Sequence, residues 1–289
     1  MTLLALCRFA HFLAGLIAFG ASAYLALFAP KALRSALAPA AGRLVAWASV
    51  VALVTALVWL ALEAASMADD TSAAADPGFI VSVLTDTAFG HAWILRLALA
   101  AALVAVAFAP RREWGVLALV AGLSLASLAL VGHAAMREGV AGLAQRANDA
   151  THLVAAGAWL GGLVGFLMSL RAYADARLSR DAVAAMMRFS SSGQFVVAAL
   201  VLTGAGNVIF VSGHPPIPLA TPYRALLAVK LALVALMIAL ALTNRFAIAP
   251  RLAKASRARA ALKTTSLIEA GLGTMVVALV SVFALLDPH

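Results

Sequence analysis

Hydrophobic residues occur along this chain in long continuous stretches rather than in alternation with polar ones. Each stretch has about 20 residues, which is enough for a helix to cross the hydrocarbon core of a bilayer. A helix also satisfies its own backbone polar groups there. The stretches lie near residues 4–28, 44–66, 91–109, 114–135, 149–171, 189–212, 224–246 and 264–286. The pattern predicts an all-α polytopic membrane bundle of eight transmembrane helices.

The composition supports this interpretation and excludes others. Of the 289 residues, 64% are hydrophobic and only 11% are charged, whereas about a quarter of a soluble protein is charged. One cysteine excludes a disulfide within the chain. No phosphate-binding loop, nucleophile elbow or zincin motif is present. We therefore expect a membrane protein that is not an enzyme.

Basic residues gather in alternate connections between the stretches. Most of the 21 Lys and Arg residues lie in the connections after the first, third, fifth and seventh stretches. Cytoplasmic loops of membrane proteins carry such an excess, so the net charge of +9 indicates a lipid bilayer rather than nucleic acid as partner. The same rule predicts that both termini are periplasmic.

Similar residues recur in the two parts of the chain. Arg96 and Lys230 are each followed by Leu-Ala-Leu, and His11 and His152 each lie near the start of an apolar stretch. The recurrence predicts two four-helix halves, 1–135 and 136–289. Because four is even, the halves are parallel and related by an axis along the membrane normal.

The histidines are the main candidates for chemistry, because the predicted topology places all six on the outer side. An unpaired imidazole is costly in an apolar helix, which singles out three of them. A thiol and a thioether lie on the same helix faces, three or four residues away, and this donor set favours copper, particularly Cu(I). The predicted metal ligands are His11, His133 and His152, with Cys7, Met136 and His214 as secondary candidates. For any single histidine, the simpler alternative is an amphipathic side chain at the headgroups.

Other polar residues within the stretches have competing explanations. Arg96 and Lys230 either extend to the interface or pair with acidic residues (Glu63 and Asp149) in the bundle. Glu269 is either an ion or proton relay or an interfacial carboxylate near the cytoplasmic end of its helix. Asn207 and the glycines at 161, 162 and 165 are expected to join helices.

Several short motifs, in their order and spacing, resemble the copper resistance protein D family (CopD). The resemblance covers essentially the whole chain. It rests on the run Thr221 to Leu231, on Asn244-Arg245, on His152 with Trp159, Gly161 and Gly162, and on Gly132-His133-Ala134. Arg224 departs from the pattern, since the family usually has glycine there.

The resemblance implies an inner-membrane protein of copper homeostasis in bacteria, which moves copper from the periplasm toward the cytoplasm. It also implies a small periplasmic copper-binding protein (CopC) as partner, and no such soluble domain is present in this sequence. Two other functions stay open. His11 and His152 would also suit a haem-binding membrane redox protein, because paired histidines hold b-type haem. The other is a copper-delivery assembly factor without transport.

Overall fold

The computed structural model describes residues 2–132, 137–212, 222–252 and 256–283, and this part of the chain is helical without any strand. In chain order the elements are α1 (Thr2–Leu27), α2 (Lys31–Ala68), η1 (Thr71–Ala75), α3 (Pro77–Asp86), α4 (Ala88–Ala107), α5 (Trp114–Ala126), η2 (Ser127–Leu130), α6 (Gly139–Ala156), η4 (Gly157–Gly161), α7 (Gly162–Ala172), α8 (Ser179–Ser212), α9 (Pro222–Thr243), η5 (Asn244–Ile248), η6 (Ala249–Arg251) and α10 (Ser256–Phe283). The predicted all-α class is confirmed.

Seven helices within the described residues are long and apolar enough to cross a membrane. One of them combines α6, η4 and α7 into a continuous helix over Gly139–Ala172. The fourth predicted stretch forms a shorter apolar helix, Trp114–Leu130. It ends there because Val131 is extended and Gly132 has a φ of 70°, a conformation that glycine adopts readily. Helix length alone therefore gives seven spans rather than the predicted eight.

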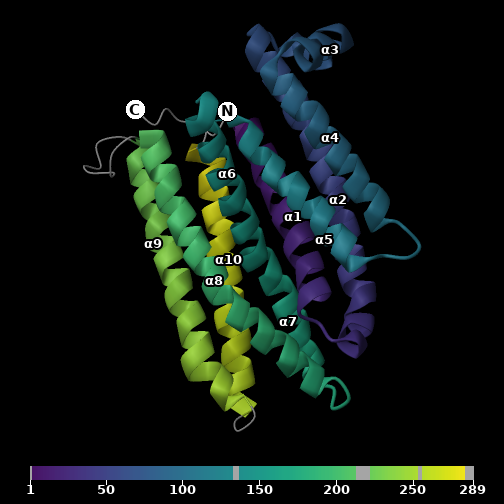
Figure 1. Ribbon diagram of the computed structural model, residues 1–289, viewed down its shortest axis with the longest axis vertical. Coiled ribbons are helices and arrows are strands. Elements are labelled where there is room, and N and C mark those ends of the chain that lie inside the picture. The colour runs from purple at the N-terminus through teal and green to yellow at the C-terminus, as the bar shows by residue number, and fades with distance from the viewer. Residues whose placement is uncertain (1, 133–136, 213–221, 253–255, 284–289) are drawn as a thin grey trace.

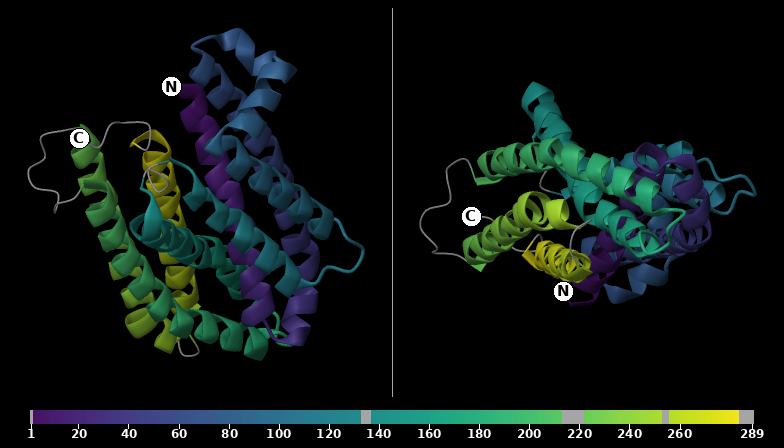
Figure 2. Two further views of the ribbon diagram at one scale, coloured as in Figure 1. Left: turned by 45° about the horizontal axis from the view of Figure 1, so that its top comes forward. Right: turned by 90° about the horizontal axis from the view of Figure 1, so that it is seen from below.

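The helices run up and down in one bundle, and α1 begins at the same end where α10 finishes (Figure 1). Helices α1, α2, α4 and α5 pack against one another on one side, while α8, α9 and α10 lie on the other (Figure 2). The continuous helix α6–η4–α7 contacts both groups. The bundle therefore has two sides that follow the order of the chain.

Glycines bring α1 directly against η4 and α7. A Cβ added at Gly161 would collide with the backbone carbonyl of Leu16, and one at Gly20 would collide with the carbonyl of Gly157. A Cβ at Gly165 would overlap the ring of Tyr24. Small residues let helices in membranes approach this closely. The expectation that these glycines join helices is confirmed, and the joint connects the two sides of the bundle.

The connection between α2 and α4 contains η1 and α3 at one end of the bundle (Figure 1). Asp76 caps α3 by accepting hydrogen bonds from the backbone N–H groups of Gly78 and Phe79. Asp70 accepts hydrogen bonds from the backbone N–H and the hydroxyl of Ser72, which lower the pKa of its carboxyl group below the usual value. These acids therefore cap short helices outside the membrane-spanning segments.

Candidate functional site

His11 of α1 lies in the first side of the bundle, between α2 and α4. It is 5% exposed. Its Nδ1 is 2.9 Å from the hydroxyl of Thr55 on α2, and its Nε2 is 3.1 Å from Nη1 of Arg96 on α4. The edge of the ring also meets Trp59, with the ring centroids 5.7 Å apart. The packing of α1 against α2 and α4 thus fixes the orientation of the His11 ring.

The partners of His11 determine how its ring is protonated. Thr55 donates its hydroxyl hydrogen to the carbonyl of Val51, at 2.6 Å, so its oxygen accepts a hydrogen bond from Nδ1–H of His11. Arg96 can only donate, so Nε2 of His11 accepts. The imidazole is therefore neutral, with its hydrogen on Nδ1 and its lone pair directed at Arg96.

Arg96 is itself enclosed in the bundle, with 1% of its surface exposed. Its guanidinium lies over the ring of Trp93, with Cζ 5.0 Å from the ring centroid. Nε and Nη2 of Arg96 are buried and have no hydrogen-bond partner among the described residues. Arg96 thus neither extends to the interface nor hydrogen-bonds Glu63, the two outcomes that the sequence suggested. Its contact with His11 was not predicted, since no sequence signal gives the rotation of α1 toward α4.

His152 of α6 is held in a similar way on the second side of the bundle. Its Nδ1 is 3.0 Å from the hydroxyl of Thr203 on α8. Thr203 donates its own hydrogen to the carbonyl of Ala199, at 2.6 Å. Lys230 of α9 is within electrostatic range of His152 and of Asp149. Each of the two histidines therefore combines a threonine on the next long helix with a basic residue on the helix after that.

The residue four positions before each histidine also makes an equivalent contact. Cys7 donates its S–H to the backbone carbonyl of Thr55, at 3.2 Å. Asn148 donates from Nδ2 to the backbone carbonyl of Thr203, at 2.9 Å. In both sites the residue four positions before the histidine thus contacts the backbone carbonyl of the threonine that orients the histidine. This residue is a cysteine beside His11 and an asparagine beside His152.

Three positions before each histidine the charges differ in sign. Arg8 lies over the ring of Trp59, with Cζ 4.9 Å from the centroid, and is within electrostatic range of Glu63. Asp149 instead accepts a hydrogen bond from Nδ2 of Asn207, at 2.9 Å. The expectation that Asn207 joins helices is confirmed, because this bond connects α8 to α6.

A second polar cluster surrounds Glu269, which is 2% exposed and lies midway along α10. Oε1 of Glu269 accepts the indole N–H of Trp159 at 2.6 Å, and Oε2 accepts Nδ2 of Asn244 at 3.4 Å. Thr265 donates its hydroxyl to Oδ1 of Asn244. The idea of an interfacial Glu269 is wrong, because three helices enclose the carboxylate.

Both hydrogen-bond donors to Glu269 lie in short π-helical segments. Trp159 belongs to η4 and Asn244 begins η5. Such segments are rare and frequently occur at functional sites, because they change the direction of one side chain within a helix. Nothing in the residue pattern indicates them, so this cluster could not be assembled from the sequence.

The structure brings some of the predicted metal ligands together. Cys7 and His11 both contact Thr55, whereas His152 bonds to α8 on the other side of the bundle. His133, Met136 and His214 lie outside the described residues. Within those residues, no group of three or more His, Cys, Asp or Glu side chains is placed to hold a metal ion. The full ligand set therefore stays a prediction.

Sequence reasoning missed Thr55 and Thr203, the residues that orient both histidines. Each is a polar residue inside an apolar helix, and that was the available signal. It is weak, because a threonine in a helix commonly bonds to the carbonyl four residues before it, as both of these do. The additional bond to a histidine depends on the packing of two helices.

The fold and these enclosed polar clusters define a multi-pass helical membrane protein. Comparison with known proteins identifies the particular family. The sequence matches the family model "Copper resistance protein D-like, N-terminal domain" over residues 1–143 and "Copper resistance protein D" over residues 183–283. The chain belongs to the copper resistance protein D family, which confirms the resemblance found in its motifs.

Two relatives support this assignment. The chain is 34% identical to Inner membrane protein YebZ of Escherichia coli (strain K12) over 283 residues, which cover 97% of each chain. It is 33% identical to Copper resistance protein D of Pseudomonas syringae pv. tomato over 221 residues, which cover 72% of this chain and 71% of the relative. No solved structure matches the sequence.

Proposed function

We propose that this protein transports copper ions across the bacterial inner membrane, from the periplasmic side toward the cytoplasm, without catalysing a reaction. Membership of the copper resistance family and the name of the E. coli relative, an inner membrane protein, support the substrate and the location. The observation that carries the proposal is a buried histidine with a thiol four residues before it, both directed at Thr55. Imidazole and sulfur are donors that Cu(I) favours.

The proposed topology has eight transmembrane helices, with α5 and η2 as the shortest. This helix packs against α1 and α4 within the bundle, and the common end of α1 and α10 (Figure 1) supports an even number of passes. The basic connections then lie in the cytoplasm and both termini in the periplasm. The matching contacts of His11 and His152 support two parallel four-helix halves, 1–135 and 136–289.

In the proposed mechanism, copper binds first to His11 and Cys7, which both contact Thr55 on the first side of the bundle. His152, on the second side, is a separate ligand position, and His133, Met136 and His214 complete the predicted ligand set. Arg96 donates a hydrogen bond to Nε2 of His11, so this nitrogen is not available to copper in the described arrangement. Copper binding requires Arg96 to move away and Cys7 to lose its proton. A site that competes with Arg96 and protons holds copper weakly enough to release it. A small periplasmic copper-binding protein of the CopC type would supply the ion.

The first test is the metal content and visible spectrum of the purified full-length protein after addition of Cu(I). The test variant replaces His11, His133 and His152 by alanine. The control is His91→Ala, which removes an exposed histidine in the first turn of α4 that bonds to the backbone carbonyl of Thr85. We expect near-stoichiometric copper in the wild type and the control, and its loss in the triple variant. Equal copper in all three proteins would exclude these ligands.

Two further readouts separate this function from its alternatives. Uptake of copper into proteoliposomes distinguishes transport from delivery without transport, since a delivery factor binds copper but shows no uptake. A stoichiometric haem band in the purified wild type would favour the redox alternative. Copper binding should also decline as the pH falls, because protons compete for the imidazole and thiolate ligands.

A further inference from the structure

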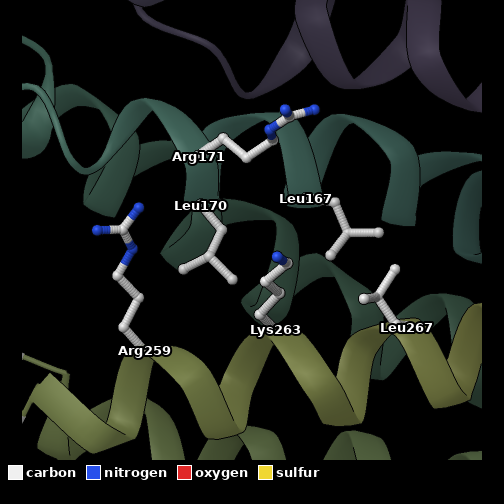
Figure 3. A pocket seen from close by; sticks show the side chains of 6 residues that line it. All are labelled: Leu167, Leu170, Arg171, Arg259, Lys263 and Leu267. Carbon is white, nitrogen blue, oxygen red and sulfur yellow. The ribbon is translucent and has the colours of Figure 1, made fainter.

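A hollow of about 570 Å³ lies between α7 and α10, away from the histidines. Two helix faces form it, as the spacing of the residues shows. Arg259, Lys263 and Leu267 follow one another at four-residue intervals on α10, and they face α7 (Figure 3). The residues that α7 contributes are Leu167, Leu170 and Arg171. The lining therefore consists of three cations and three leucines.

The cations in this hollow are available to a ligand. The side chains of Arg171, Arg259 and Lys263 make no hydrogen bond or ion pair with another residue in the part of the chain that the structure describes. Arg259 and Lys263 extend from α10 toward α7 (Figure 3). Three positive charges around one hollow repel one another unless an anion binds among them.

The start of α10 adds to this positive potential. Its first turn contains no acidic residue, although the N-terminus of a helix carries a partial positive charge that acidic groups usually balance. Arg259 and Lys263 lie in the first two turns of this helix. Cations at this end of a helix are unfavourable by themselves, so an external anion would relieve both sources of repulsion.

The position of the hollow and its apolar lining indicate which anion. Arg171 lies at the end of one membrane-spanning helix, and Arg259 lies near the beginning of another, which places both at headgroup depth. Leu267, further into the span, is 49% exposed. A free inorganic anion gains nothing from leucines, whereas a lipid brings a phosphate and acyl chains together. Basic hollows between transmembrane helices recognise anionic headgroups in this way.

We propose that the hollow between α7 and α10 is a binding site for an anionic phospholipid. Its phosphate interacts with Arg259 and Lys263, Arg171 adds positive charge at the edge of the hollow, and an acyl chain follows Leu267 and Leu167. The proposal is independent of copper transport. It assigns to the second side of the bundle a lipid contact that the histidine sites do not use.

The test measures lipid binding to the purified full-length protein in a neutral detergent. The ligands are phosphatidylglycerol, phosphatidylcholine and inorganic phosphate. The test variant is Arg259→Gln/Lys263→Gln. The control is Arg180→Gln/Arg257→Gln, which removes the same charge at two exposed positions outside the hollow.

We expect phosphatidylglycerol to bind more tightly than phosphatidylcholine and to raise the melting temperature of the wild type. The test variant should bind it about thirtyfold more weakly, since each cation near an anionic headgroup contributes about fivefold. The control should stay within about twofold of the wild type, because exposed charges elsewhere interact weakly. The melting temperature of each variant without lipid shows that it is folded.

Three results would overturn the proposal. The first is equal affinity for the two lipids. The second is an equal loss of affinity in the test variant and the control, which would indicate a general effect of net charge. The third is displacement of the lipid by millimolar inorganic phosphate, which would show that the hollow binds a free anion and that the leucines contribute nothing.

Discussion

His11 and His152 are oriented in the same way, but they are surrounded by different groups. Each donates from Nδ1 to a threonine on the next long helix. Around His11 the other groups are a thiol and a guanidinium, and the guanidinium bonds to the ring. Around His152 they are amides and a carboxylate that bond to one another, with Lys230 within electrostatic range of the ring. The same helix packing thus serves a soft-donor site in one place and a hydrogen-bonded joint in the other.

A similar contrast separates the two carboxylates that accept an indole N–H. Glu63 accepts from Trp59, four residues earlier in the same helix, at 2.9 Å, and it is only half-buried. Glu269 accepts from Trp159 on another helix and is 2% exposed. A local bond at a partly exposed position contributes little, whereas an enclosed bond between helices contributes more. The contact of Glu269 therefore contributes more to stability than the contact of Glu63.

The largest expected effect comes from removing these two carboxylates separately. Glu269→Ala should lower the free energy of unfolding by about 3 kcal/mol, because it leaves the buried donors of Trp159 and Asn244 without a partner. Glu63→Ala should cost less than about 1 kcal/mol, since water can reach that site. Thermal unfolding in detergent measures both. Glu269→Gln keeps one acceptor oxygen for Trp159 and should recover most of the loss; equal losses for the two alanine variants would remove the contrast.

The next effect tests whether the two histidines are held equally. Thr55→Val and Thr203→Val keep the shape of the side chain but remove the hydroxyl that accepts from Nδ1–H of each histidine, which leaves only the backbone carbonyls of Ala52 and Leu200. We expect each variant to lose about 1–2 kcal/mol of stability. Serine at either position keeps the hydroxyl and should restore the bond. A control is Thr85→Val, at an exposed threonine that bonds only within its own connection, where the change should be small. If only one of Thr55→Val and Thr203→Val destabilises the protein, the surroundings of the two histidines are not equivalent.

Replacement of Arg96 tests the difference between the two histidine surroundings directly. Arg96→Gln weakens the competitor for Nε2 of His11, so Cu(I) should bind about tenfold more tightly, which corresponds to about 1.4 kcal/mol. Competition with a chelator of known affinity measures this change. The double variant Arg96→Gln/His11→Ala should lose the gain. A gain that persists without His11 would show that Arg96 acts on a different ligand.

The sequence predicted much of the fold, because long apolar stretches and loop charges depend on local composition. The sequence did not predict that the helix of the fourth stretch ends at Leu130. The residues there are apolar, and the helix ends because Val131 is extended and Gly132 has a positive φ. The recurrence of His11 and His152 was visible in the sequence. Their partners were not, because the contact of Arg96 with His11 depends on how three helices rotate and slide against one another.

The smallest expected effect is on stability, when alanine replaces Cys7 or Asn148, which occupy equivalent positions four residues before the two histidines. Cys7→Ala removes one weak S–H bond and should cost only about 0.5 kcal/mol of stability. Asn148→Ala removes two amide bonds, to the carbonyl of Thr203 and to Asn207, and should cost about 1–2 kcal/mol.

The order should reverse when Cu(I) binding is measured. A thiolate is a far better Cu(I) ligand than an amide, so Cys7→Ala should weaken binding while Asn148→Ala leaves it unchanged. Cys7→Ser keeps a hydrogen-bond donor to Thr55 but lacks sulfur, and it should match the wild type in stability and Cys7→Ala in copper affinity. If Cys7→Ser binds copper as the wild type does, the thiol is only a packing contact, and the two histidine surroundings differ in charge alone.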